Sequence, residues 1–111
     1  MPIFTRTFDF LSWLLPATDR FPRAHRFTAT QRLLNAAFDL RERLELANYR
    51  QGTERLALLR QADGDLDRVR LYLRLAARWG WLSGGQYQHA AEMTTEIGRL
   101  LGGWARVTRG S

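Results

Sequence analysis

The apolar residues of this chain recur at steps of three and four over most of its length, which is the spacing of one face of an α-helix. From Thr28 onward the sequence is rich in Leu, Ala, Arg, Glu and Gln, and all three prolines lie within the first 22 residues. Such a composition favours helix. Alternating steps of three and four also form a heptad pattern, in which helices pack along a shared seam. The three predicted seams are Leu33, Ala37, Leu40, Leu44 and Ala47; Leu59, Ala62, Leu66, Val69, Leu73 and Ala76; and Tyr87, Ala90, Thr94, Ile97, Leu101 and Trp104.

A very apolar helix is predicted before these three, over residues 3–15. We expect it to end at Pro16, because proline inside a helix removes a hydrogen bond, and an irregular connection follows. Apolar side chains spread around much of this helix. Phe4, Phe8, Leu11 and Leu15 share one face, and Phe10, Trp13 and Leu14 widen it.

Turn and capping residues place the other helices at about residues 29–50, 54–79 and 84–104. Thr28 with Gln31 has the spacing of a capping box, in which two side chains bond each other's backbone N–H groups, and so has Ser83 with Gln86. The tail after the last helix is expected to fray. Four helices joined by short loops, over residues 1–111, predict one all-α domain, an antiparallel up-and-down four-helix bundle.

Three further strips, two apolar and one of small residues, lie beside the seams, and one bundle core cannot easily bury them all. They are Leu34, Phe38 and Tyr49; Leu71, Leu75 and Trp79; and the small residues Ala91, Thr95, Gly98 and Gly102. Glycine inside a helix costs about 1 kcal/mol relative to alanine, so the small residues suggest that something approaches that helix closely. Two interpretations stay open, a tight contact within one bundle or packing between subunits. The residues expected to pack subunits together are Leu34, Phe38, Leu71, Leu75, Gly98 and Gly102.

The charge balance favours an anionic partner. The chain has 17 basic residues, all of them arginine, against 11 acidic ones, for a net charge of +6. The arginine fork bonds phosphate and stacks on bases, although a GC-rich genome would also supply arginine in place of lysine. Arginines gather in three segments free of acidic residues, around residues 20–32, 68–78 and 99–109. A solvated face is the alternative to a binding surface. The arginines expected to contact nucleic acid or a protein partner are Arg23, Arg26, Arg70, Arg74 and Arg78, the last three forming a ridge on one helix.

Catalytic and metal-binding patterns are missing from the sequence. There is no cysteine, no phosphate-cradling glycine loop and no Ser/His/Asp arrangement, so we predict no enzyme activity, no metal and no cofactor. His25 and His89 are interpreted as solvated, and Asp63, Asp65 and Asp67 as surface charge. Neither a signal peptide nor a membrane span is evident, which leads us to expect a cytoplasmic protein.

Four stretches of the sequence resemble the Avd family, the accessory variability determinants of diversity-generating retroelements. They are "FPRAHRFTATQRLLNAAFDL" (21–40), "LANY" (46–49), "LYLRLAARWGWLSGGQYQHAAEM" (71–93) and "EIGRLLGGW" (96–104). The resemblance implies a four-helix bundle that assembles as a barrel-shaped homopentamer with a basic exterior. It also implies binding to the retroelement's reverse transcriptase and template RNA, in support of error-prone cDNA synthesis by that polymerase.

Two features depart from the family pattern: lysine is absent, and Gly84 and Gly85 stand where polar or charged residues are usual. Similar bundle proteins are encoded in intervening sequences of bacterial ribosomal RNA genes. A structural homo-oligomer of that type, without a nucleic-acid role, therefore stays open as the alternative.

Overall fold

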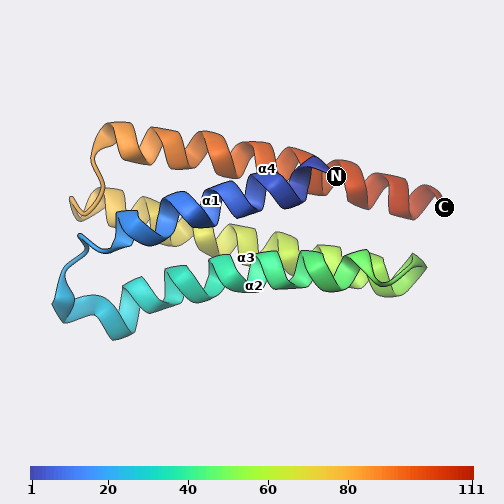
Figure 1. Ribbon diagram of the computed structural model, residues 1–111, viewed down its shortest axis with the longest axis horizontal. Coiled ribbons are helices and arrows are strands. Elements are labelled where there is room, and N and C mark those ends of the chain that lie inside the picture. The colour runs from blue at the N-terminus through green and yellow to red at the C-terminus, as the bar shows by residue number, and fades with distance from the viewer.

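Four long helices, connected in antiparallel succession, make up the computed structural model, which describes residues 1–111 and contains no strand (Figure 1). The α1–α2 and α3–α4 connections lie at one end of a molecule measuring 46 × 25 × 19 Å, and the α2–α3 connection lies at the other, toward which both termini point. Two short helical turns precede α2. The elements are α1 (Pro2–Thr18), η1 (Arg23–His25), η2 (Arg26–Thr30), α2 (Gln31–Asn48), α3 (Gly52–Arg78) and α4 (Gly84–Gly110).

The heptad seams form the core of the bundle, as predicted. Every seam residue of α2 and α3 is buried, and in α4 only Tyr87 is half-buried. Removing these side chains from water is the main force that holds the helices together, at about 25 cal/mol for each Å² of apolar surface. None of the four helices combines the length and the hydropathy that crossing a bilayer requires.

The face of α1 singled out in the sequence is not its buried face. The side chains of Phe8 and Leu15 are 64% and 47% exposed, and Phe4 and Leu11 are only partly buried. The core receives Ile3, Thr7, Phe10, Leu14 and Thr18 instead. The two threonines fit an apolar core because their hydroxyls donate to carbonyls of the same helix, at 2.8 Å in each case. Because α1 is apolar on most sides, periodicity alone does not select the face that packs.

Pro16 does not end α1, which continues to Thr18. The lost backbone hydrogen bond falls in the last turn, where few intrahelical bonds remain to be made, so the helix tolerates the proline.

The predicted capping box at Thr28 is wrong, whereas the one at Ser83 is confirmed. The Thr28 hydroxyl donates to the His25 carbonyl, and the chain passes through a π-helical turn directly into α2, so upstream carbonyls accept from the first N–H groups of that helix. At α4 the Ser83 hydroxyl accepts from the Gln86 backbone N–H at 3.1 Å, and the Gln86 side chain accepts from the Ser83 N–H at 2.9 Å.

The C-terminal tail is helical rather than frayed. Helix α4 runs six residues beyond Trp104, to Gly110, and buries Thr108, whose hydroxyl donates to the Trp104 carbonyl at 2.8 Å. Trp104 in turn packs edge-on against Phe4 of α1, with ring centroids 5.8 Å apart. The packing of α1 against α4 therefore extends the helix beyond the point where the sequence pattern fades.

Candidate nucleic-acid interface

Most of the arginines have no acidic partner. Six form ion pairs within the chain: Arg41, Arg43, Arg50, Arg68, Arg70 and Arg99. The remaining eleven make no ion pair, and they include four of the five arginines predicted to bind a partner. An unpaired surface guanidinium keeps its full charge and its N–H donors available to an anion.

The predicted ridge on α3 has two free members rather than three. Arg70 pairs with Asp67 at 3.2 Å and donates to the Thr94 carbonyl of α4 at 3.4 Å, so its guanidinium lies across the groove between α3 and α4. Arg74 and Arg78 are exposed and make no ion pair. Arg74 lines a hollow of about 320 Å³ in the same groove, together with Asp67, Arg70, Leu73, Tyr87, Ala91, Thr94 and Thr95.

Gly98 of α4 makes room for side chains of α3, first of all for Arg70. A methyl group on Gly98 would lie 2.5 Å from Arg70 Nη2 and 3.5 Å from Leu66 Cδ2. At Gly102 no atom of the chain would lie within 4 Å of such a methyl group. The interpretation of the small-residue strip as a tight contact within one bundle is therefore wrong at Gly102, while packing between subunits stays a prediction.

Alanine at Gly102 should raise the free energy of unfolding by about 0.5–1 kcal/mol, because it restores helix propensity without meeting a neighbour. Alanine at Gly98 should raise the free energy of unfolding by less, because the Arg70 guanidinium must move aside to make room for the methyl group. Urea denaturation of the two variants beside the wild-type protein measures both. A loss of stability from Gly102→Ala would show that a second chain packs on this glycine.

Arg23 and Arg26 lie apart from the α3 ridge, at the end of α1. Both are exposed, and they line a hollow of about 240 Å³ that shares no residue with the α3–α4 groove. Thr30 lines the same hollow and is 7% exposed, and its hydroxyl has no hydrogen-bond partner. The other lining residues are Thr18, Asp19, Phe21, Pro22 and Leu34. The two guanidinium groups suit an anionic oxygen, with the Asp19 carboxylate opposing it, whereas the Thr30 hydroxyl is shielded from solvent.

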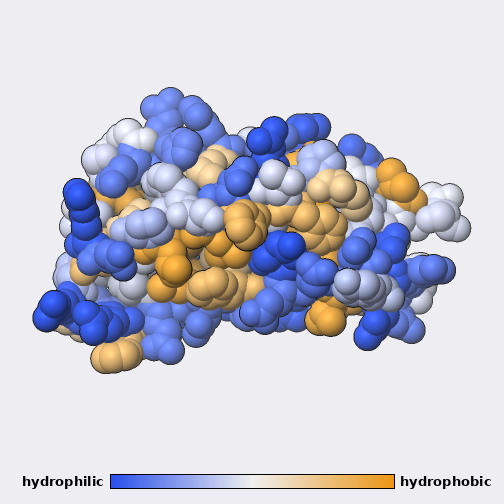
Figure 2. Space-filling model, in the orientation of Figure 1, coloured by the Kyte–Doolittle hydropathy of each residue, from blue (hydrophilic) through white to orange (hydrophobic).

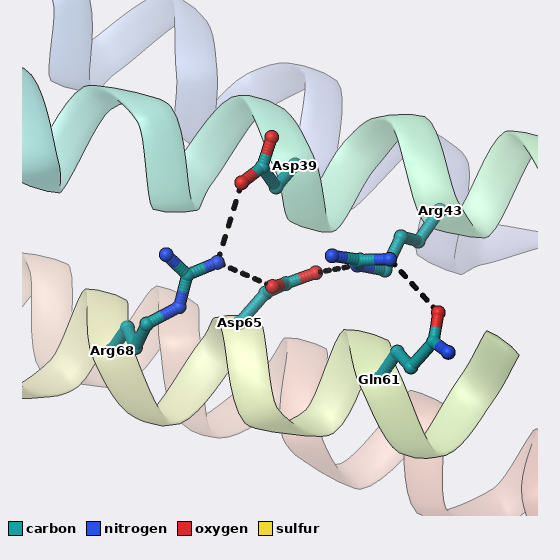
Figure 3. Close-up of polar contacts among 5 residues, drawn as sticks. All are labelled: Asp39, Arg43, Gln61, Asp65 and Arg68. Carbon is teal, nitrogen blue, oxygen red and sulfur yellow. Dashed lines mark hydrogen bonds and ion pairs between the residues drawn. The ribbon is translucent and has the colours of Figure 1, made fainter. Parts of the chain in front are cut away.

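The prediction of surface charge is wrong for Asp65, although Asp63 and Asp67 are exposed as expected. Asp65 is 3% exposed between α2 and α3, where its carboxylate accepts from Arg43 Nε at 2.6 Å and from Arg68 Nη2 at 2.5 Å (Figure 3). The hydrogen bond with Asp65 is the main cause that raises the pKa of the Arg68 guanidinium. The charge of Arg68 is therefore offset by a carboxylate of its own helix, and Arg68 adds little to the basic surface.

Two contacts extend this buried network at its edges. Arg68 also reaches Asp39 of α2 at 3.3 Å, and Arg43 donates to the Gln61 side chain of α3 at 2.8 Å (Figure 3). Two ion pairs cross from one helix to the other, Arg43 of α2 with Asp65 of α3 and Arg68 of α3 with Asp39 of α2, and sliding either helix by one turn would separate both pairs.

Two tryptophans that sequence reasoning did not assign to a site lie at the same end of the bundle as Arg23 and Arg26. Trp79 is 49% exposed, and Trp81 contacts the ring of His25 in a stacked geometry, with centroids 5.3 Å apart. The sequence pattern places Trp79 on an apolar strip with Leu71 and Leu75 and gives Trp81 no role; the available signal is the pair of tryptophans around Gly80. No three His, Asp or Glu side chains gather in a way that could hold a metal ion.

The bundle has the same fold as a solved helical protein. A crystal structure of a protein of unknown function from the S23 ribosomal protein family of Bacteroides thetaiotaomicron matches it with a TM-score of 0.79 and 17% sequence identity, over 89% of this chain and 94% of that chain. No curated protein matches the sequence. The chain belongs to the bAvd-like family, which its sequence matches over residues 1–108. The resemblance to Avd proteins is thereby confirmed.

Proposed function

We propose that the protein is a non-enzymatic accessory factor of a diversity-generating retroelement, which binds the element's reverse transcriptase and template RNA and supports mutagenic cDNA synthesis. Membership of the bAvd-like family supports the retroelement context. The observation that carries RNA binding is the set of exposed arginines without acidic partners. Arg23 and Arg26 line one hollow, and Arg74 and Arg78 make no ion pair on α3.

Contacts from arginines to phosphates depend on charge and not on base identity. The affinity for RNA should therefore depend little on the nucleotide sequence. It should fall steeply as the salt concentration rises, because each phosphate that the protein neutralises releases counterions.

Self-association belongs to the same proposal, with a homopentamer as the expected form. Apolar side chains gather over α1 in the middle of one face of the molecule (Figure 2). Two apolar residues of α1, Phe8 and Leu15, are exposed. On α2, Phe38 is 38% exposed and Leu34 is half-buried against the core. On α3, Leu71 is 42% exposed and Leu75 is half-buried.

A closed ring of identical subunits needs two different faces that fit each other, and these separate apolar surfaces are candidates for them. Five copies of a chain of net charge +6 would carry about +30, which would strengthen the attraction of a polyanion.

Charge reversal at the free arginines tests RNA binding. The double variants Arg23→Glu/Arg26→Glu and Arg74→Glu/Arg78→Glu should each weaken binding of the retroelement template RNA on the order of 10- to 100-fold, because phosphate contacts are lost and like charges are introduced. Fluorescence anisotropy at several salt concentrations measures the affinity and its salt slope, which should become shallower. Co-purification with the reverse transcriptase measures the protein partner in the same variants.

The matched control is Arg50→Glu/Arg99→Glu, which changes the net charge by the same amount at arginines that already pair with Glu54 and Glu96. If the two test variants bind RNA as the control does, with assembly intact, these arginines are not the RNA site. The neighbouring DNA distinguishes the alternative role: a reverse transcriptase gene with template and variable repeats supports the proposal, and a ribosomal RNA gene supports a structural homo-oligomer.

A further inference from the structure

An aromatic hollow at the end of the bundle is lined by none of the arginines to which RNA contacts were assigned above. It measures about 690 Å³ and lies between the start of α2 and the end of α3. This volume is within the range of small-ligand sites. The residues that line it are His25, Thr28, Ala29, Arg32, Tyr72, Leu75, Trp79 and Trp81.

The backbone holds both tryptophans in place. Gly80 has a φ of +78° and stands between them, its N–H bonded to the Ala77 carbonyl at 3.1 Å, while the Trp81 N–H reaches the Ala76 carbonyl at 2.8 Å. This pair of bonds is the Schellman motif, which closes a helix and fixes the direction of the next residues. The capping box at Ser83 then starts α4 two residues after Trp81, so the connection has little freedom.

The aromatic rings support one another. The Trp81 ring contacts Phe21 on one side and the stacked His25 ring on another, with centroids 5.3 Å away in both cases. Trp79 contacts Trp81 at 4.9 Å while about half of its own surface remains open to solvent. A large apolar ring held rigidly at the edge of a hollow is a platform on which another planar ring can stack at low entropic cost.

The polar lining indicates the charge of the occupant. No carboxylate lines the hollow, and the one charged side chain there, Arg32, makes no ion pair. Arg78 is one residue from Trp79 and is also unpaired. A planar ring system joined to an anionic group fits this combination. An apolar side chain of a protein partner would offer the unpaired arginine neither a hydrogen-bond acceptor nor a negative charge.

We infer that the hollow binds an unpaired base of single-stranded RNA, stacked on Trp79, with a neighbouring phosphate on Arg32. The inference rests on the proposed RNA binding and assigns it a specific subsite. Bases of a duplex are already stacked on each other and cannot enter such a hollow, so this site distinguishes single strands from duplexes.

The experiment compares two RNA probes of about 12 nucleotides or base pairs, a length within the usual site size: an unstructured single strand and a blunt duplex, both labelled with fluorescein. Trp79→Ala should weaken binding of the single strand by about 5- to 100-fold, the usual effect of removing one stacking platform, and leave duplex binding within about twofold. Trp79→Phe, which keeps a ring, should retain most of the affinity. The single strand should also quench tryptophan fluorescence in the wild-type protein and less so in Trp79→Ala.

The control is Trp13→Phe, at a half-buried tryptophan of α1 that contacts His89, which should change neither affinity nor quenching. Equal binding of the single strand by wild-type and Trp79→Ala proteins, or equal losses on both probes, overturns the subsite while the arginine variants still test the proposed function. If the wild-type protein binds neither probe, the RNA binding in the proposed function fails as well. A change of mass by light scattering in Trp79→Ala assigns the hollow to subunit packing and overturns the inference.

Discussion

Replacing Phe10 with alanine should lower the free energy of unfolding by about 3–5 kcal/mol, while the same change at Phe8, two residues away, should alter it by no more than about 0.5 kcal/mol. Phe10 is 1% exposed in the core, so its truncation leaves a cavity that the packed helices cannot fill. Phe8 is 64% exposed and loses few contacts within its own chain. Chemical denaturation, followed by circular dichroism at low protein concentration, compares the two variants.

Phe8 and Phe10 form a matched pair, because both changes remove the same atoms from the same helix. A larger loss at Phe8 than at Phe10 in the dissociated chain would mean that α1 packs through the other face. Light scattering at high concentration adds a second reading: if the exposed α1 surface joins subunits, Phe8→Ala should reduce the mass in solution without unfolding the chain.

Removing both arginines that hold Asp65 should cost about 2–4 kcal/mol in the variant Arg43→Met/Arg68→Met, because a buried carboxylate would then lack a cationic partner. The effect is smaller than for a fully enclosed pair, since both arginine side chains reach solvent and water can follow when they are removed. Thermal or urea denaturation of the variant and the wild-type protein measures this loss in the free energy of unfolding.

Adding Asp65→Leu to that variant should recover most of the lost stability, because an apolar side chain of similar size needs no partner in the α2–α3 interface. Arg50→Met is the control: it breaks an ion pair between exposed partners and should cost no more than about 0.5 kcal/mol. If the double variant is as stable as the control, the carboxylate is solvated and does not hold the helices in register.

The bundle was predictable from the sequence where apolar residues occupy one side of a helix. The seams of α2 and α3 follow steps of three and four without exception, and all of their residues are buried. In α1 the same reasoning failed, because apolar residues surround the helix and two buried threonines look polar in the sequence. The final turns of α4 were missed in the sequence analysis. Two contacts hold these turns, the hydrogen bond from the Thr108 hydroxyl to the Trp104 carbonyl and the packing of Trp104 against α1, and the sequence pattern does not show them.

The candidate site was less predictable than the fold. The number of arginines in the sequence does not show which of them form ion pairs. Pairing depends on which residues of the neighbouring helix lie opposite each arginine. In the sequence, Arg68, Arg70 and Arg74 look equivalent. In the structure Arg70 donates to a carbonyl of α4, and Arg68 pairs with the buried carboxylate of Asp65. The aromatic hollow joins residues about 50 positions apart, His25 and Trp79 among them, which no local pattern can reveal.

The bundle places its two chain ends on the side remote from the α1–α2 and α3–α4 connections (Figure 1). A dye, an affinity handle or a fused reporter at either terminus would consequently stand clear of Trp79, Arg23 and Arg26, which lie at the opposite end. Energy transfer from such a terminal label to a fluorophore on captured RNA could then report the polarity with which the strand lies on the protein.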